Sequence, residues 1–308
     1  MSFWSIFDIS LIHATIRAST PIIFAALAAV ISSNAGILNV GIEGGMLTAA
    51  FTAIAVNSVT GSWILGVLAA VAACEIYSAV IAAAHLKFHA DVFAVGTIMN
   101  IMALGLTSFL LEILFDVSGK YVSDSVQIIP SLSLKIFSGN AVLNSIFNNY
   151  SVFEILAVVM IAVIYFLLYR TIWGLRVRGA GLHDEATLTA GINPVAKKWQ
   201  AILVSGILVG LGGAYMSTSY VNMFVEDMIS GRGFMGLAAM FFGKSEPVLS
   251  SVGCLVFGFT DSVGARLQYL GIYPQFIQMI PYIVTVVIYA ASMYFKGKKN
   301  RKMNSAVS

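Results

Sequence analysis

Residues 62–84 read SWILGVLAAVAACEIYSAVIAAA, an apolar run in which Glu75 is the only charged side chain. A helix needs about 20 predominantly apolar residues to cross the hydrocarbon core of a bilayer. A run of this length and composition satisfies that requirement. We therefore predict that residues 62–84 form a transmembrane helix.

Similar runs recur on both sides of this one. The chain is 59% apolar and 10% charged, whereas soluble domains carry about 25% charged residues. The predicted fold class is all-α, a single polytopic transmembrane domain over residues 1–308 with about nine spans, or eight to ten. The run at 233–243 is too short for a straight crossing, so it either extends through the glycines before it or is re-entrant. The predicted spans are 10–31, 44–60, 62–84, 91–115, 151–169, 199–220, 233–243, 250–267 and 275–295.

The basic residues indicate how the bundle is oriented, because Lys and Arg accumulate in the short cytoplasmic loops of membrane proteins. A cytoplasmic C-terminus places twelve of the 17 basic residues on that side, including a charged loop at 170–198 and a basic tail at 296–308. The N-terminus and the polar segment at about 116–150 then lie outside. The tail is too short and isolated to indicate nucleic-acid binding. The twelve residues are Lys87, Arg170, Arg176, Arg178, Lys197, Lys198, Lys244, Lys296, Lys298, Lys299, Arg301 and Lys302.

None of the common catalytic or nucleotide-binding patterns is complete in the sequence. Residues 238–245 fit a permissive phosphate-binding loop, but the strict pattern begins with glycine and follows a strand, and here two phenylalanines occupy the loop. Lys244 is better explained as a charge at the cytoplasmic end of a span. His183 has no second histidine at metal-ligand spacing. The sequence therefore predicts a protein that is not an enzyme, with no catalytic residue, metal or cofactor.

Polar side chains inside or at the ends of apolar runs are costly and indicate function by default. Each could line a solute path, or it could only pack through a hydrogen bond between helices or as a buried neutral carboxyl. For Glu75 the two interpretations are evenly balanced. Glu43 is better supported, because residues 39–45 contain glycines that can break a helix and expose backbone groups. The main polar residues of this kind are Glu43, Glu75, Asn100 and Asp261.

The charged loop at 170–198 contains a stretch with helical signals. Residues 184–190 can form two turns of helix, with Asp184 and Glu185 at the positive N-terminal end and Gly191 as a stop. A short amphipathic helix between basic flanks would suit docking of a cytoplasmic protein. A solvated connector that binds nothing is the alternative, and the residues alone favour it.

Five motifs occur in an order that resembles the permeases of ABC importers of the branched-chain amino acid, simple sugar and nucleoside type. The short N-terminus and the motif at 39–44 are most similar to the shorter permease subunit of bacterial nucleoside importers. The motifs are Asn-Val-Gly-Ile-Glu-Gly at 39–44, the coupling-loop residues 174–178 with 190–193, residues 205–215, residues 231–244, and Pro281-Tyr282.

The resemblance implies a path for a nucleoside-like solute, with ATP hydrolysis on a partner subunit. It also implies a four-part assembly in the bacterial cytoplasmic membrane, in contact with membrane lipid. The other parts would be a fused double ATPase, a second and different permease, and an extracytoplasmic substrate-binding lipoprotein. Simple sugar or riboflavin-like cargo is an alternative. A further alternative is an ion-coupled secondary transporter that uses Glu43, Glu75 and Asp261.

By the same resemblance, residues 183–191 would be a coupling helix seated in a groove of the ATPase. The sequence departs from the family at Gly181-Leu182-His183-Asp184, where Gly-Glu-x-Pro is usual, and at Ser33-Asn34, where Glu-Arg is usual. Both differences remove charge or rigidity near the ATPase. The docking candidates are His183, Asp184, Glu185, Ala186 and Gly191, and the candidates for the translocation path are Asn39, Gly41, Glu43, Gly44, Glu75, Asn100 and Asp261.

Overall fold

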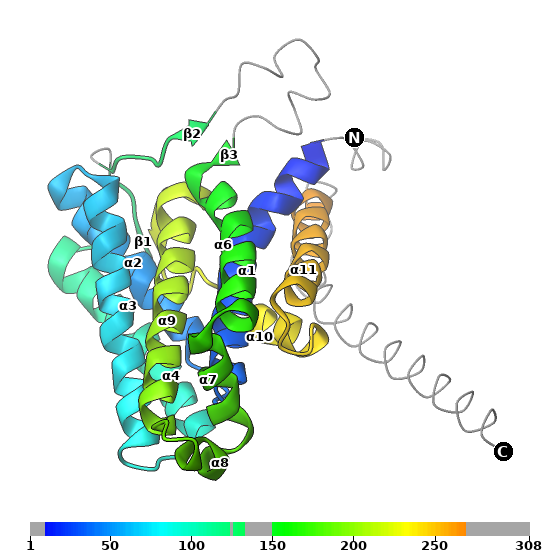
Figure 1. Cartoon of the computed structure of the whole chain (residues 1–308). Helices are drawn as coiled ribbons and strands as arrows, with labels where there is room; N and C mark the ends of the chain where they lie inside the picture. Colours follow the sequence, from blue (N-terminus) through cyan, green and yellow to red (C-terminus); the bar gives the residue numbers. More distant parts are fainter. Residues whose placement is uncertain (1–9, 124–125, 133–149, 269–308) are drawn as a thin grey trace.

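The apolar runs fold into helices in the expected order. The computed structural model describes residues 10–123, 126–132 and 150–268 (Figure 1). Short antiparallel strand pairs, β1 with β4 and β2 with β3, connect segments between the helices. The helices are α1 (Ser10–Asn34), α2 (Ile42–Thr60), α3 (Trp63–Leu86), α4 (Val92–Phe115), α6 (Val152–Arg170), α7 (Ile172–Leu182), α8 (Asp184–Thr189), α9 (Pro194–Tyr215), the π-helical turn η3 (Met216–Tyr220), α10 (Arg232–Phe242) and α11 (Pro247–Gln268). The strands are β1 (Lys120–Tyr121), β2 (Ser131–Leu132), β3 (Tyr150–Ser151) and β4 (Phe224–Val225).

The prediction of a polytopic helical bundle is confirmed. In the part of the chain that the structure describes, 7 helices are long and apolar enough to cross a membrane, and each corresponds to a predicted span. The run at 233–243 corresponds to α10, which has 11 residues and is too short to cross. The span expected at 275–295 lies outside the described residues, as does the basic tail, so the described part contains seven spans and one half-length helix.

The charged loop at 170–198 is more helical than expected, because α7, α8 and the first turn of α9 occupy most of it. Helix α9 begins at Pro194, before the predicted start at 199. The Asn193 side chain accepts a hydrogen bond from the Ala196 amide at 3.1 Å and caps the helix, and Pro194 fits the first turn. These local signals extend the helix beyond its apolar run.

Two helices form the centre of the bundle. Helix α1 packs against α9, α10 and α11, and α9 also packs against α2 and α3. In both α1 and α9, 78% of the most apolar 18-residue stretch is buried, compared with 22% in α4. The outward faces of α3, α4 and α6 carry exposed large apolar side chains, including Leu68, Ile101 and Val158. Such faces are what lipid or another transmembrane subunit would cover.

Glycines allow α9 to approach its neighbours closely. A Cβ atom at Gly210 would lie 2.9 Å from the Cα of Val71 in α3, and one at Gly213 would collide with the Met46 carbonyl oxygen of α2. The Gly206-x-x-x-Gly210 spacing seen in the sequence therefore lies on the α3 side of α9. Small residues at a helix contact let the two backbones pack without an intervening side chain.

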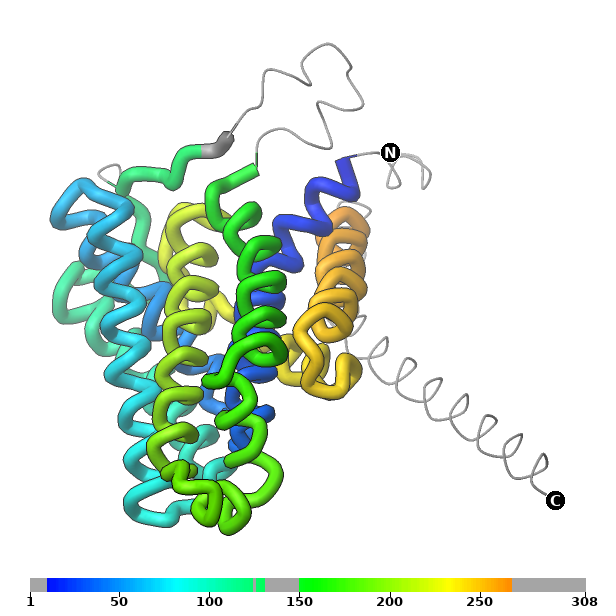
Figure 2. The backbone as a smooth tube through the Cα atoms, in the orientation of Figure 1, coloured from blue at the N-terminus to red at the C-terminus, as the bar shows by residue number. Residues whose placement is uncertain are grey.

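After α9 the chain turns back into the bundle. Figure 2 follows the backbone from α9 through residues 221–231 to α10. Within this segment β4 pairs with β1, which follows α4. We call residues 221–231 the returning segment. Its end meets the start of α10 inside the bundle, so α10 runs from the interior toward the end of the bundle that carries α8, the α8 end (Figure 1).

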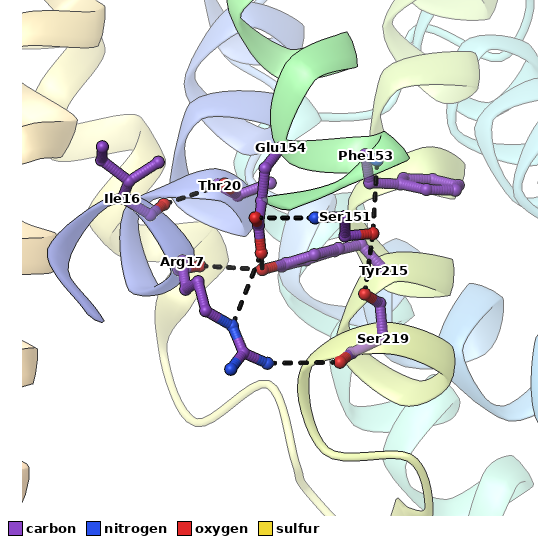
Figure 3. Close-up of polar contacts among 8 residues, drawn as sticks. All are labelled: Ile16, Arg17, Thr20, Ser151, Phe153, Glu154, Tyr215 and Ser219. Carbon is purple, nitrogen blue, oxygen red and sulfur yellow. Dashed lines mark hydrogen bonds and ion pairs between the residues drawn. The ribbon is translucent and has the colours of Figure 1, made fainter. Parts of the chain in front are cut away.

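A buried polar network ties α1, α6 and α9 together near the opposite end (Figure 3). The Glu154 carboxylate accepts a hydrogen bond from the Tyr215 hydroxyl at 2.8 Å and lies 3.5 Å from the Arg17 guanidinium. Its other oxygen accepts from the Ser151 amide at 2.9 Å, which completes a capping box at the start of α6. Glu154 is only 3% exposed, and these partners offset the free-energy cost of burying its carboxylate.

We expect Gly213→Ala to lower stability, because its added methyl group would collide with the Met46 carbonyl and the Ala49 Cβ atom of α2. Overpacking of this kind costs about 1–3 kcal/mol. The measurement is the melting temperature of the purified protein in detergent. Gly105→Ala is the matched control, because nothing lies within 4 Å of a Cβ atom at Gly105 in α4. Equal melting temperatures for the two variants would contradict the close α2–α9 contact.

Candidate functional site

The chain breaks just before α2. The Asn39 side chain, 2% exposed, accepts a hydrogen bond from the Gly41 amide at 3.0 Å and closes a local turn. A Cβ atom at Gly96 in α4 would lie 2.8 Å from the Gly41 nitrogen, so the break packs directly against α4. Residues 39–41 therefore form a non-helical entry to α2, as the glycines predicted.

Glu43, in the first turn of α2, caps the start of another helix. Its two carboxylate oxygens accept hydrogen bonds from the amides of Gly231 and Gly233, each at 2.7 Å. These amides belong to the N-terminal turn of α10, where N–H groups lack helical partners and the helix dipole favours a negative charge. A side chain at Gly233 would collide with the Glu43 backbone, since a Cβ atom there would lie 2.8 Å from Cα. The ion–dipole contact thus joins α2 to α10.

This contact lies deep in the bundle. Helix α10 has 11 residues and rises about 16 Å from Gly231 toward the α8 end. The hydrocarbon core of a bilayer is about 30 Å thick, so Glu43 lies about half that thickness from the charged turn with Lys244 and Glu246 that follows α10. Polar groups at that depth need protein partners or water.

Asn100 connects α4 to the same region. Its amide oxygen accepts from the Gly44 amide at 2.8 Å and from the Tyr77 hydroxyl at 3.3 Å, and its NH2 group donates to the Val40 carbonyl at 3.0 Å. The side chain therefore satisfies backbone groups on both sides of the break before α2. Tyr77 was not a sequence candidate, because a tyrosine in an apolar span is ordinarily a packing residue.

A pocket of about 180 Å³ opens beside Glu43 on the outer side of α2 and α4. It combines acidic, amide and aliphatic groups at mid-span depth. Of the candidates for the translocation path, Glu43, Gly44 and Asn100 line this pocket, whereas Asn39 and Gly41 do not. The remaining lining residues are Leu47, Ile101, Leu104, Asp227 and Ile229.

Two of the predicted path residues lie elsewhere. Asp261 in α11 forms an ion pair with Arg232 at 2.9 Å. Glu75 packs beside Gly206 of α9, and its Oε1 atom is buried without a hydrogen-bond partner among the described residues. Neither residue lines the pocket, so the pocket gathers only the candidates from residues 39–44 and α4.

Sequence reasoning missed a second polar cluster beside the returning segment. The ring of Tyr220 lies between two guanidinium groups, with the Arg17 and Arg232 carbons 5.7 and 5.8 Å from its centroid. Arg232 also pairs with Asp261, and Arg17 pairs with Glu154. The available signal was Arg232 between two glycines, a pattern that can break a helix but that was used only as part of the family motif at 231–244.

The α8 helix lies at the tip of the bundle, beside the start of α9 (Figure 1). It begins after His183, whose extended backbone caps it, and ends before Gly191, which has a φ of +74°. Thr187 is buried, and its hydroxyl donates to the His183 carbonyl at 2.9 Å. An ion pair of 2.7 Å joins Asp184 to Lys198 of α9. The predicted two-turn helix and its glycine stop are therefore both present.

The remaining docking candidates face outward. Glu185 and Ala186 are exposed, and the flanking Leu182 and Leu188 are 87% and 57% exposed. Exposed leucines on both sides of Glu185, on a projecting surface, are typical of an interaction site. The motif at 238–245 lies in the second half of α10 and in the turn before α11, so it does not form the loop between a strand and a helix that phosphate binding requires.

Comparisons with known proteins agree with this arrangement. Residues 11–289 match the model of the branched-chain amino acid transport system permease component. The chain is 34% identical to the guanosine ABC transporter permease protein NupQ of Bacillus subtilis, over 90% of each chain. It is 33% identical to the nucleoside ABC transporter permease protein NupC of Lactococcus lactis, over 91% of this chain and 90% of that one.

A second Bacillus subtilis protein, the guanosine ABC transporter permease protein NupP, is 24% identical over 93% of this chain and 82% of its own length. No solved structure matches the chain. The match to the family model covers nearly all of the chain, including the break before α2, the α8 helix and the returning segment. The chain therefore belongs to the family of branched-chain amino acid-type permease components of ABC transport systems.

Proposed function

We propose that this chain is one of two permease subunits of an ABC importer for nucleoside-like solutes. The observation that carries the proposal is the pocket beside Glu43, which presents polar groups at mid-span depth. The nucleoside and guanosine permeases NupC and NupQ, aligned over about nine-tenths of the chain, support the solute class. The pocket mixes hydrogen-bonding groups with aliphatic side chains, as sites for small organic molecules do.

The position of the pocket supports a path between two subunits. The pocket opens on the outward side of α2 and α4, where Ile101 is 68% exposed. The carboxylates of Glu43 and Asp227 would be costly in contact with lipid, so a second transmembrane subunit would cover them and complete the path. Two differently named guanosine permeases, NupQ and NupP, occur in Bacillus subtilis, which supports a second and different permease.

The α8 helix would couple this path to ATP hydrolysis. In the proposed orientation the α8 end is cytoplasmic, the N-terminus lies outside, and the ATPase receives Glu185 and the exposed leucines in a groove. This orientation puts Lys87, Arg170 and Lys244 at the cytoplasmic ends of their helices, as the positive-inside rule requires. A lipoprotein outside the membrane would deliver the solute, and a fused double ATPase would drive transport in the bacterial cytoplasmic membrane.

We expect Glu185→Arg to abolish ATP-dependent uptake while the assembly persists, because the reversed charge would face the ATPase and the Glu185 carboxylate makes no hydrogen bond or ion pair among the described residues. The measurements are uptake into proteoliposomes and co-purification of the ATPase. Glu112→Arg is the control, because it makes the same charge change at an exposed position near the C-terminal end of α4, away from α8. Uptake of at least half the wild-type rate by Glu185→Arg would rule out the docking role.

We expect Leu104→Trp to reduce uptake about tenfold or more, because the larger side chain fills the pocket. Leu106→Trp is the matched control. The two leucines lie on different faces of α4 and are 41% and 43% exposed, but only Leu104 lines the pocket. The measurement is initial uptake of labelled guanosine by the assembled transporter, and equal uptake by both variants would contradict the path.

Uptake by this chain alone, driven by an ion gradient without an ATPase, would favour the alternative of a secondary transporter. That alternative would draw on Glu75, whose Oε1 atom has no hydrogen-bond partner in the described part of the chain. Uptake of a simple sugar or a riboflavin-like compound in place of guanosine would retain the permease role and replace the solute.

A further inference from the structure

The pocket beside Glu43 carries negative charge and no lining cation. Its charged lining residues are Glu43 and Asp227, and none of its described lining residues is Lys, Arg or His. Arg232, which follows the returning segment, is instead paired with Asp261 of α11. The electrostatic character of the pocket is therefore set by two carboxylates.

The two carboxylates differ in whether their oxygens are free to accept a hydrogen bond from a solute. Both Glu43 oxygens already accept hydrogen bonds from backbone amides of α10, so this side chain is anchored in the wall. The Asp227 carboxylate is exposed and makes no hydrogen bond or ion pair among the described residues. Asp227 therefore supplies the free acceptor of the pocket, while Glu43 adds fixed charge.

Aliphatic side chains form the other part of the wall. Leu47 and Leu104 come from α2 and α4, and Ile229 comes from the returning segment. A flat ring can pack against such a surface, while hydroxyl groups on the same solute reach a carboxylate. The volume of about 180 Å³ is below the 300–1,000 Å³ typical of complete ligand pockets, as expected for half of a site.

We propose that Asp227 is a specificity-determining residue that accepts hydrogen bonds from the hydroxyl groups of an uncharged solute and excludes anionic relatives of that solute. Hydroxyl donors form charge-assisted hydrogen bonds with a carboxylate, which are about twice as strong as neutral ones. A phosphate ester brings about two negative charges at neutral pH into a pocket that already holds two carboxylates. The subsite therefore favours a nucleoside over its 5′-monophosphate, an inference that rests on the proposed path.

The test compares solutes that differ only in these groups. The assembled permeases and ATPase, without the lipoprotein, are assayed for binding of labelled guanosine in competition with 2′,3′-dideoxyguanosine and guanosine 5′-monophosphate. Because a charge-assisted hydrogen bond is worth about tenfold or more in affinity, wild type should prefer guanosine to the dideoxy compound by at least that factor. In Asp227→Asn, the ratio of the affinity for guanosine to that for the dideoxy compound should fall about fivefold. The variant should also bind the monophosphate more tightly than wild type does.

Asn suits position 227 because the residue has a φ of +54°, a conformation that asparagine adopts more readily than most residues. Glu226→Gln is the matched control. It removes the same charge from the adjacent residue, whose carboxylate accepts a hydrogen bond from the Gly119 amide at 2.9 Å and does not line the pocket. Glu226→Gln should retain the wild-type order of affinities.

Several outcomes would overturn the subsite. These are an Asp227→Asn variant with unchanged preferences, a wild-type complex with no hydroxyl-dependent binding, or binding that requires a metal cation and loses that requirement in Asp227→Asn. If wild type binds ribose but not guanosine, the nucleoside assignment fails by itself. The subsite is then judged by whether Asp227→Asn loses the preference for ribose over 2-deoxyribose.

Discussion

The contact between the Glu43 carboxylate and the N-terminal amides of α10 is the constraint on which the interior of this permease depends. A helix that begins in the middle of a membrane exposes backbone N–H groups where no bulk water can satisfy them. Glu43 satisfies two of them, at Gly231 and Gly233, and places its charge at the positive end of the helix dipole. Without such a cap a half-length helix at this depth would leave costly unpaired donors.

The same contact fixes one end of the returning segment, and arginines fix the other. Tyr220, just before this segment, lies between the guanidinium groups of Arg17 and Arg232. Between the two ends, β4 pairs with β1. Non-helical backbone is tolerated inside a membrane where protein partners satisfy it or where it lines a cavity, and this segment meets both conditions. Asp227 and Ile229 consequently reach the pocket from a well-anchored segment.

Local patterns predicted the helices and the positions of the breaks, but not the partners across them. Apolar runs predicted the seven described spans, and Gly191 correctly predicted the end of α8. The glycines around Glu43 indicated a break, yet its partner Gly231 is 188 residues away, and no local signal encodes that pairing. Glu75 and Asp261 are as polar as Glu43, so composition could not tell that only Glu43 would line the pocket.

Helix α9 connects the two functional regions through one continuous backbone. It starts shortly after α8, the proposed docking helix, where Lys198 pairs with Asp184, and it ends at η3, directly before the returning segment. Glycines seat its middle closely on α2 and α3, so it has little room to bend sideways. The π-helical turn at Met216–Tyr220 interrupts its regular geometry just before the returning segment, a feature that often marks functional positions in helices. A shift imposed at α8 therefore has a direct covalent route to Asp227 and the wall of the pocket.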